Sequence, residues 1–313
     1  MEKIIFLSNS EVEQLSVEER KEYYQKLKLY CQNETKTKKA SDIGHKIITT
    51  VYPLLRKYTL EIRGEENIPK DDSAIFMCNH SNSHDFFTAH ETFAKIGKSV
   101  SVFAARDGLN PFVKEIFSLA DATLIDRTDK ESSSKGVYEF SKKIIEGKCG
   151  VIFGESTWNL HPLYPMQTLK IGGTKVGAIT GKVIVPTIFE YIEVPEILDK
   201  EADLYSKCII SFGEPIKIKP EENLITQTAY IQHIMSEMRK KIWEEFYIKK
   251  DTLSDINPEL YINHTYLKKF KAFGYTYDSE YETQFLYSKK PNKPENEYHI
   301  NEDGEFVPGI IKK

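Results

Sequence analysis

Short runs of apolar residues alternate with segments of helical periodicity through the middle of the chain. Six such runs occur, at residues 74–78, 99–104, 122–125, 150–153, 183–189 and 207–212. Helical patterns fit between them, for example at residues 133–146 and 173–180. Runs that are apolar at nearly every position are typical of strands covered on both faces. The pattern therefore predicts a mixed α/β fold, with a largely buried sheet flanked by helices.

Helices are also predicted on either side of this region. Residues 16–29 form a charged helix in our interpretation, and residues 41–58 form a second one that completes an N-terminal helical pair. Pro53 should kink the second helix or mark its end. Residues 226–247 show a clear amphipathic pattern. In the second helix of the pair, helical spacing places seven apolar side chains on one face: Ile43, Ile47, Ile48, Val51, Leu54, Leu55 and Tyr58.

These patterns divide the chain into three parts. Residues 1–60 form the N-terminal helical segment, residues 61–250 the α/β domain, and residues 251–313 an appendage rich in Tyr, Phe, Lys, Asn and Pro. Between positions 36 and 57 there are six basic residues and one acid. A basic amphipathic segment suits an anionic membrane surface. The alternative is a helix packed on its own domain with solvated lysines, and the sequence leaves both open.

Composition limits the class of protein. The 313 residues are 40% hydrophobic and carry a net charge of -4, so no basic field favours nucleic acid. No window approaches eighteen consecutive apolar residues, and the N-terminus does not resemble a signal peptide, so we expect any membrane contact to be peripheral. The four cysteines are scattered, which favours reduced thiols in a cytosolic protein. Neither a GxGxxG motif nor a P-loop occurs.

The stretch MCNHSNSHDFF, residues 77–87, carries the first candidate chemistry. His80 follows a predicted buried strand, and Asp85 comes five positions later, where the chain enters a helix. A carboxylate that accepts a hydrogen bond from one ring nitrogen leaves the other nitrogen able to take a proton. No Ser or Cys lies in a GxSxG elbow. We therefore expect His80 to act directly on a substrate hydroxyl or on water.

A metal site is the alternative interpretation of the same residues. His80, His84, Asp85, His90 and Glu155 could supply ligands for zinc or iron in a hydrolase. This alternative explains neither Arg127 nor the block around residues 183–187.

Four blocks in order along the chain resemble the glycerolipid acyltransferases, the lysophosphatidic acid acyltransferase family. The resemblance extends from about residue 64 to residue 215. The blocks are NHSNSHD (79–85), LIDR (124–127), FGEST (153–157) and VIVPT (183–187). Three smaller features agree with that family: FAARDGL (103–109), LKIGG (169–173) and FGEPI (212–216).

The resemblance implies a role for each matching residue. His80 matches the base that deprotonates the acceptor hydroxyl, and Asp85 matches the carboxylate that orients it. Arg127 and Arg106 match groups that hold the acceptor's phosphate, for which a guanidinium is well suited. Further substrate-binding positions are Glu155, Ser156, Thr157 and Lys170, and Pro186 matches the Val-Pro block that shapes the site.

The third block, FGESTWN, departs from the family's Phe-Pro-Glu-Gly-Thr-Arg. Gly154 and Ser156 replace proline and glycine, and Trp158 stands where an arginine would touch phosphate. Tryptophan stacks on sugar rings and lies well at membrane interfaces, so a glycolipid, a polyol or another lysolipid is an alternative acceptor. Ordinary explanations also exist: Arg127 could pair with a neighbouring aspartate, and Trp158 could serve packing alone.

The function implied is transfer of an acyl group from acyl-CoA or acyl carrier protein to a lysolipid hydroxyl, such as that of 1-acyl-glycerol-3-phosphate. The implied reaction needs no metal and no cofactor beyond the acyl thioester. Its partners would be that donor, the lipid acceptor and a membrane surface, and we expect a cytoplasmic protein held peripherally on the inner membrane face. A non-catalytic lipid-binding relative is the remaining alternative.

Overall fold

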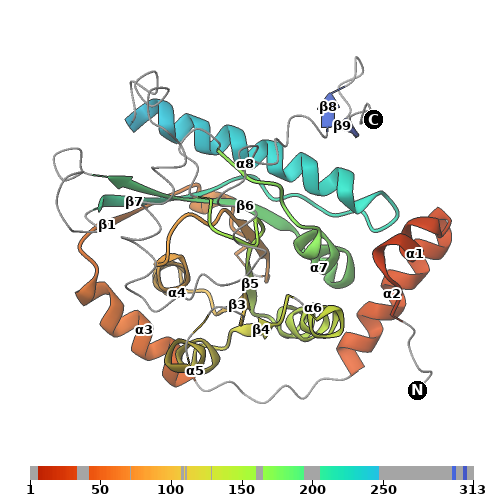
Figure 1. Cartoon of the computed structure of the whole chain (residues 1–313), viewed down its shortest axis with the longest axis horizontal. Helices are drawn as coiled ribbons and strands as arrows, with labels where there is room; N and C mark the ends of the chain where they lie inside the picture. Colours follow the sequence, from red (N-terminus) through yellow and green to blue (C-terminus); the bar gives the residue numbers. More distant parts are fainter. Residues whose placement is uncertain are drawn as a thin grey trace.

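The computed structural model describes residues 6–33, 42–70, 72–106, 109, 111–127, 129–159, 165–193, 205–246, 298–300 and 306–308. Within these ranges, one mixed sheet of seven strands runs through the molecule in the order β1-β7-β6-β2-β5-β3-β4 (Figure 1). The strands β6 and β7 pair antiparallel, and the other neighbours pair parallel. The predicted mixed α/β class is confirmed.

The strands of the sheet are β1 (Thr59–Arg63), β2 (Ile75–Cys78), β3 (Val100–Ala105), β4 (Thr123–Ile125), β5 (Cys149–Phe153), β6 (Ile184–Glu193) and β7 (Tyr205–Phe212). The helices are α1 (Asn9–Gln14), α2 (Val17–Asn33), α3 (Asp42–Leu55), α4 (Asp85–Lys95), α5 (Pro111–Leu119), α6 (Lys130–Ile145), α7 (Gly172–Thr180) and α8 (Leu224–Phe246), with a short 3-10 turn, η1 (Glu65–Asn67).

Every predicted apolar run is a strand, but the prediction missed β1. This strand lies at the edge of the sheet and reads TLEIR, with Glu61 and Arg63 alternating with apolar residues. Charged side chains are common on edge strands because they discourage pairing with other chains. An edge strand therefore lacks the continuous apolar run by which the inner strands were found. β1 also crosses the predicted domain boundary at residue 60.

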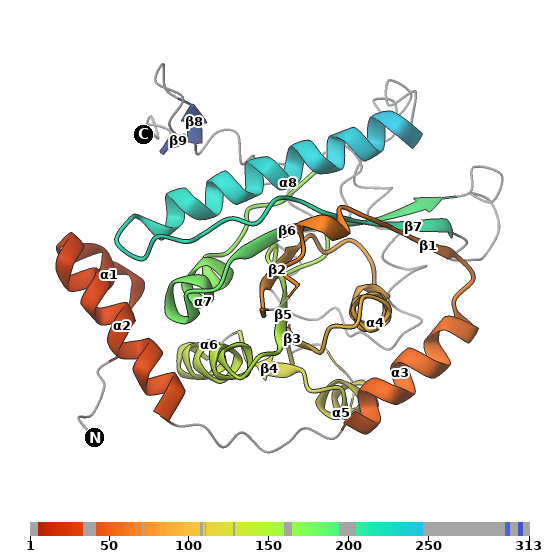
Figure 2. The same cartoon turned by 180° about the vertical axis from the view of Figure 1, so that it is seen from behind.

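Helices cover both faces of the sheet. α3, α4 and α5 pack on one face, and α2, α6, α7 and α8 pack on the other (Figures 1 and 2). Alternate residues of β2 point to the two layers: Ile75 and Met77 join the core under α6 to α8, while Phe76 and Cys78 join the core under α3 to α5. All four are fully buried, because a central parallel strand is covered on both sides.

The N-terminal helices lie on opposite faces of the sheet. α2 contacts α6 and α7, whereas α3 contacts α4 and α5. The approach of α3 to α5 is close, since a Cβ atom at Gly44 would lie 2.2 Å from the backbone carbon of Leu119. Pro53 lies in the last turn of α3, where it ends the helix without kinking its middle.

The apolar residues of α3 divide between two environments. Ile48 and Tyr52 are buried against the domain. Four others face solvent, and so do Phe112 and Leu119 of α5, a helix that contacts α3. The exposed fractions are 53% for Ile47, 44% for Val51, 81% for Leu54, 69% for Leu55, 74% for Phe112 and 38% for Leu119. We call these six residues the α3–α5 patch.

Two short strands lie in the predicted C-terminal appendage. β8 (Tyr298–Ile300) and β9 (Phe306–Pro308) pair antiparallel, and β9 lies near α8. The rest of residues 251–313 lies outside the described residues, as does His161. Within the described ranges, every helix is too short or too polar to cross a membrane.

Candidate active site

The candidate residues gather at one edge of the sheet. His80 follows β2, Glu155 follows β5, Arg106 follows β3 and Arg127 follows β4. These four strands are neighbours and run parallel, so their carboxyl ends meet at the same edge. Ligand sites of open α/β sheets occur at this edge. Residues from blocks that are separate along the chain therefore lie close together in space.

Asn79 fixes the loop that carries His80. Its side-chain amide donates to the carbonyl oxygen of Phe189 at 3.0 Å, and its carbonyl oxygen accepts from the Phe189 amide at 2.7 Å. Both bonds are buried. Through them, the Asn79 side chain extends the hydrogen bonding between β2 and β6 beyond the end of β2. The sequence interpretation gave Asn79 no role. The sequence offered one indication of this role: Asn79 directly follows an apolar strand, where a side-chain amide can replace a backbone hydrogen bond of the sheet.

His80 and Asp85 form the predicted dyad. The distance from His80 Nδ1 to Asp85 Oδ2 is 2.7 Å. Asp85 begins α4 and is fully buried, and the same oxygen accepts the amides of Ser81 and Asn82 at 3.0 Å each. These bonds hold the carboxylate in one orientation. With Nδ1 donating to Asp85, the lone pair of the imidazole lies on Nε2, which can accept a proton.

Two aromatic rings flank the His80 imidazole. Phe153 stacks on it with centroids 4.6 Å apart and an interplanar angle of 26°, and the ring of Trp158 lies 5.6 Å away. The side chain of His80 remains 22% exposed, so the aromatic walls restrict it without closing it off. Trp158 is therefore next to the predicted base, as its place in the third block indicated.

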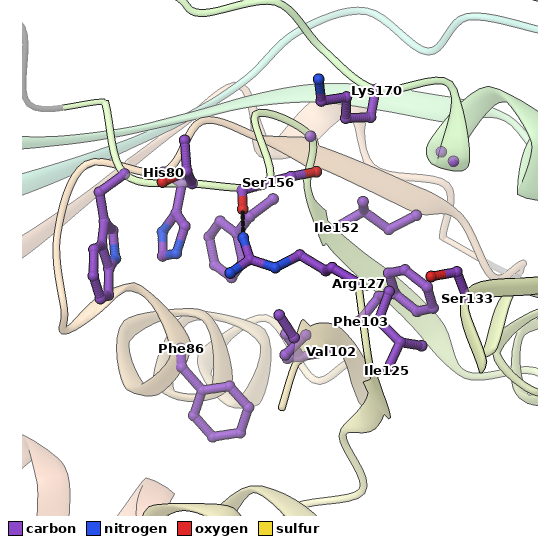
Figure 3. Close-up of a pocket in the computed structure, with 18 of the residues that line it drawn as sticks. His80, Phe86, Val102, Phe103, Ile125, Arg127, Ser133, Ile152, Ser156 and Lys170 are labelled. Carbon is purple, nitrogen blue, oxygen red and sulfur yellow. Dashed lines mark hydrogen bonds between the residues drawn. The ribbon is translucent and has the colours of Figure 1, made fainter. Parts of the chain in front are cut away.

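A pocket of about 340 Å³ opens beside His80 (Figure 3). His80, Ser156, Thr157 and Trp158 lie at its polar end, together with Arg127 and Lys170. Most of the other wall is apolar and comes from both sides of the sheet edge. Its larger members are Phe86, Val102, Phe103, Phe117, Ile125, Val137 and Ile152. Such a wall is suited to an apolar ligand.

The predicted cationic residues differ in position. Arg127 lines the pocket, and its Nη1 donates to the carbonyl oxygen of Ser156 at 2.6 Å. Lys170 lines the pocket from the other side and is exposed. Arg106 pairs with Asp126 at 3.0 Å, is 54% exposed and is not part of the pocket wall. Among the described residues, Arg127 and Lys170 are therefore the cations beside the polar end.

Glu155 points into the protein and holds two loops together. Its Oε2 accepts the backbone amide of His80, and its Oε1 accepts that of Gln167, both at 2.6 Å. The side chain is 1% exposed and does not line the pocket. Burial raises the pKa of Glu155 to about 7, against the opposing effects of the Arg239 charge and the two amides. This geometry is that of a positioning residue.

The unusual residues of the third block have local explanations. The amide of Gly154 donates to the carbonyl oxygen of Cys78 at 2.9 Å, which a proline could not do. Ser156 has φ of +60°, a backbone conformation that favours glycine. Thr157 lines the pocket and is buried, and its hydroxyl has no hydrogen-bond partner among the described residues.

The histidines of the alternative metal set are held apart from one another. His90 is fully buried and faces His45, with 3.1 Å between the two Nδ1 atoms. Burial and this neighbour lower the pKa of His90 to about 3. Burial also lowers the pKa of His84. In the described part of the chain, no three His, Cys, Asp or Glu side chains lie together as metal ligands would, so the geometry gives the metal set no support. Pro186 lies within β6, away from the pocket wall.

The site thus combines an oriented imidazole with an apolar cavity and nearby cations. This combination is suited to an enzyme that activates a hydroxyl with a general base and binds an apolar substrate. Residues 59–187 match the model of the Acyltransferase family. The match supports the predicted resemblance to the acyltransferases over these residues.

Two other comparisons concern whole proteins. The chain is similar in structure to the 1-acyl-sn-glycerophosphate (LPA) acyltransferase PlsC from Thermotoga maritima, with 15% sequence identity and a TM-score of 0.45. The similarity covers 74% of this chain and 86% of that protein. No curated protein matches the chain significantly.

Proposed function

We propose that the protein transfers an acyl group from an acyl thioester, acyl-CoA or acyl carrier protein, to the hydroxyl of a lysophospholipid or related lipid. The observation that carries this proposal is the His80–Asp85 dyad at the polar end of an apolar pocket. 1-Acyl-glycerol-3-phosphate, the substrate in the name of the Thermotoga protein, is one candidate acceptor.

The proposed reaction begins with proton transfer to His80. Nδ1 donates to Asp85, and Nε2 takes the proton of the acceptor hydroxyl as its oxygen attacks the thioester carbonyl carbon. The new C–O bond forms, the C–S bond breaks, and the leaving sulfur receives the proton from the imidazolium. Buried Asp85 stabilises the imidazolium during this step. Thr157 is our candidate hydrogen-bond donor to the carbonyl oxygen, because it lines the pocket and its hydroxyl lacks a partner among the described residues.

Arg127 and Lys170 support an anionic acceptor. Both lie beside the polar end of the pocket, and a guanidinium binds phosphate through paired hydrogen bonds. Trp158 occupies the remaining wall next to His80, so part of the acceptor meets an aromatic surface there. These side chains can accommodate a phosphate, and they can also accommodate a sugar or polyol group. Comparison of acceptors that carry one or the other would show which the protein prefers.

We further propose that the protein works at a membrane surface through the α3–α5 patch. The patch exposes six large apolar residues on two adjacent helices. Exposed Lys46 and Lys57 of the same segment can interact with anionic lipid headgroups. Phe117 of α5 lies in the pocket wall, so part of that wall lies in the layer that carries the patch. A lipid acceptor would therefore have a short path to the site.

The test is thiol release from a panel of acyl-CoAs, with and without lysophosphatidate or a lysoglycolipid. We expect acceptor-dependent release by the wild type and a loss of about 100- to 10,000-fold in His80→Ala, the contribution typical of a general base. His233→Ala, on α8, is the matched control. Equal rates for wild type and His80→Ala would reject the mechanism. Release that requires no acceptor and stops with chelator would support the hydrolase alternative.

A further inference from the structure

A second, larger cavity lies on the face of the sheet opposite the α3–α5 patch. Its volume is about 1380 Å³. It is bounded by the residues that lead into α1, by α6, by the segment that leads into α7, and by the first turns of α8. Most pockets for small ligands measure about 300–1,000 Å³. This groove is therefore large enough for an extended ligand.

The groove continues into the active-site pocket. Five residues line both: Arg127, Ser133, Val137, Lys170 and Gly172. Figure 3 shows Arg127 and Ser133 along one wall of the active-site pocket, with Lys170 at its upper rim. The two cavities therefore adjoin at these residues, and His80 lines the active-site pocket on the other side of them.

The groove is cationic although the whole chain has a net charge of -4. Five cations line it, namely Arg127, Lys135, Lys142, Lys170 and Lys175, against two carboxylates. Of these carboxylates, Glu139 pairs with Lys142 at 2.9 Å. Glu11 accepts the amide of Ser8 at 2.7 Å in the capping of α1. By formal charge, the five cations and two carboxylates of the lining give the groove a net charge of +3.

Lys175 is the most informative of these cations. It lies in the first turn of α7 and is half-buried, and burial lowers the pKa of its ammonium group. Its one polar contact among the described residues is with Asn9 Oδ1, at 3.5 Å. Removing an ammonium group from water without a carboxylate partner is unfavourable. An anionic ligand in the groove would offset this cost.

We propose that the groove binds the phosphorylated end of coenzyme A, with Lys175 as a phosphate contact. This proposal rests on the proposed function and adds the identity of the donor. Coenzyme A carries several phosphates and an unbranched arm that ends in the thioester sulfur. That arm would pass Lys170 and Arg127 to place the thioester carbonyl beside His80. The cations lie within a recess between helices, which suits a small molecule better than the surface of a carrier protein.

The first test measures binding without catalysis. Calorimetric titration of the full-length protein with desulfo-coenzyme A should show binding that weakens at least tenfold in Lys175→Gln. Lys240→Gln is the matched control, because Lys240 is an exposed lysine of α8 that pairs with Glu237. It should bind as the wild type does. Circular dichroism establishes that each variant is folded. Equal binding by Lys175→Gln and wild type would overturn the proposal.

The second test asks whether Lys175 acts on the phosphates of the donor or on its reacting thioester. Lys175→Gln should raise KM for acyl-CoA at least tenfold and leave KM for an acyl-N-acetylcysteamine thioester, which has no phosphate, unchanged. An equal effect on both donors would overturn the assignment of Lys175 to the phosphates. Transfer from acyl carrier protein without any binding of coenzyme A would overturn the donor proposal while the acyltransferase function stands. Binding of coenzyme A that depends on Lys175, without transfer to any acceptor, would support the groove and reject the proposed function.

Discussion

The two faces of the sheet differ in the surface that they present. The α3–α5 face exposes a patch of apolar side chains, whereas the opposite face holds a cationic groove between α6, α7 and α8. Both faces reach the same pocket at the carboxyl edge of the strands. The proposed reaction joins a lipid to a charged thioester, and the two surfaces differ in the same way as these two proposed substrates.

The largest expected effect concerns the apolar face. The double substitution Leu54→Glu and Leu55→Glu should weaken binding to anionic phospholipid vesicles by about 100-fold or more, because each leucine contributes about 1.5–3 kcal/mol when buried in lipid. Vesicle co-sedimentation measures the effect. Leu29→Glu is the control, since Leu29 is 56% exposed on α2 of the other face. Equal losses of vesicle binding in both variants would show that the two faces do not differ in lipid binding.

The next effect concerns Glu155, which joins the two sides of the site through His80 and Gln167. Its pKa is about 7 in the folded protein against an ordinary value of 4.5. The folded state therefore binds this proton more tightly than the unfolded state. The resulting stability is present below about pH 4.5 and is lost as the pH rises through 7, by up to about 3 kcal/mol.

Urea unfolding between pH 4.5 and 8 measures this dependence. Glu155→Gln carries no titratable group and should flatten the slope, although the loss of one accepted hydrogen bond lowers its stability at every pH. Glu237→Gln, on the exposed side of α8, should leave the slope unchanged. A slope that is the same in wild type and Glu155→Gln would contradict the raised pKa.

A smaller effect compares one glycine from each face. Gly44→Ala should destabilise the protein by about 1–3 kcal/mol, because the added methyl group would meet the Leu119 backbone and force α3 away from α5. Gly172→Ala in α7 meets no neighbouring heavy atom within 4 Å and should change stability by less than about 1 kcal/mol. Chemical denaturation measures both. Similar losses would show that the close approach of α3 is not a constraint.

The smallest effect concerns Ser156, at the boundary between the faces. Its positive φ is a strained conformation for a residue with a Cβ atom. Ser156→Gly should stabilise the protein by up to about 1 kcal/mol in thermal or urea unfolding. Ser156→Ala keeps the Cβ atom and should show no gain. A gain in both variants would point to the hydroxyl group rather than to backbone strain.

Local patterns along the chain were sufficient for much of this description. The inner strands were predicted because a central strand is apolar on both faces, and the helices at residues 133–146, 173–180 and 226–247 because their periodicity is strong. The His80–Asp85 contact followed from spacing across a turn. These features depend on neighbours within a few residues, which is the range that a sequence pattern records.

Other features depend on contacts between distant segments and could not be obtained in this way. Helical spacing identified the apolar residues of α3 but not which of them the domain would cover, so one predicted face became a buried part and an exposed part. Glu155 was expected to face the acceptor, but amides from residues 80 and 167 draw it inward. The groove assembles side chains from α1, α6, α7 and α8 around Lys175. Only packing of these helices on the sheet brings their charges together, because their positions along the chain are unrelated.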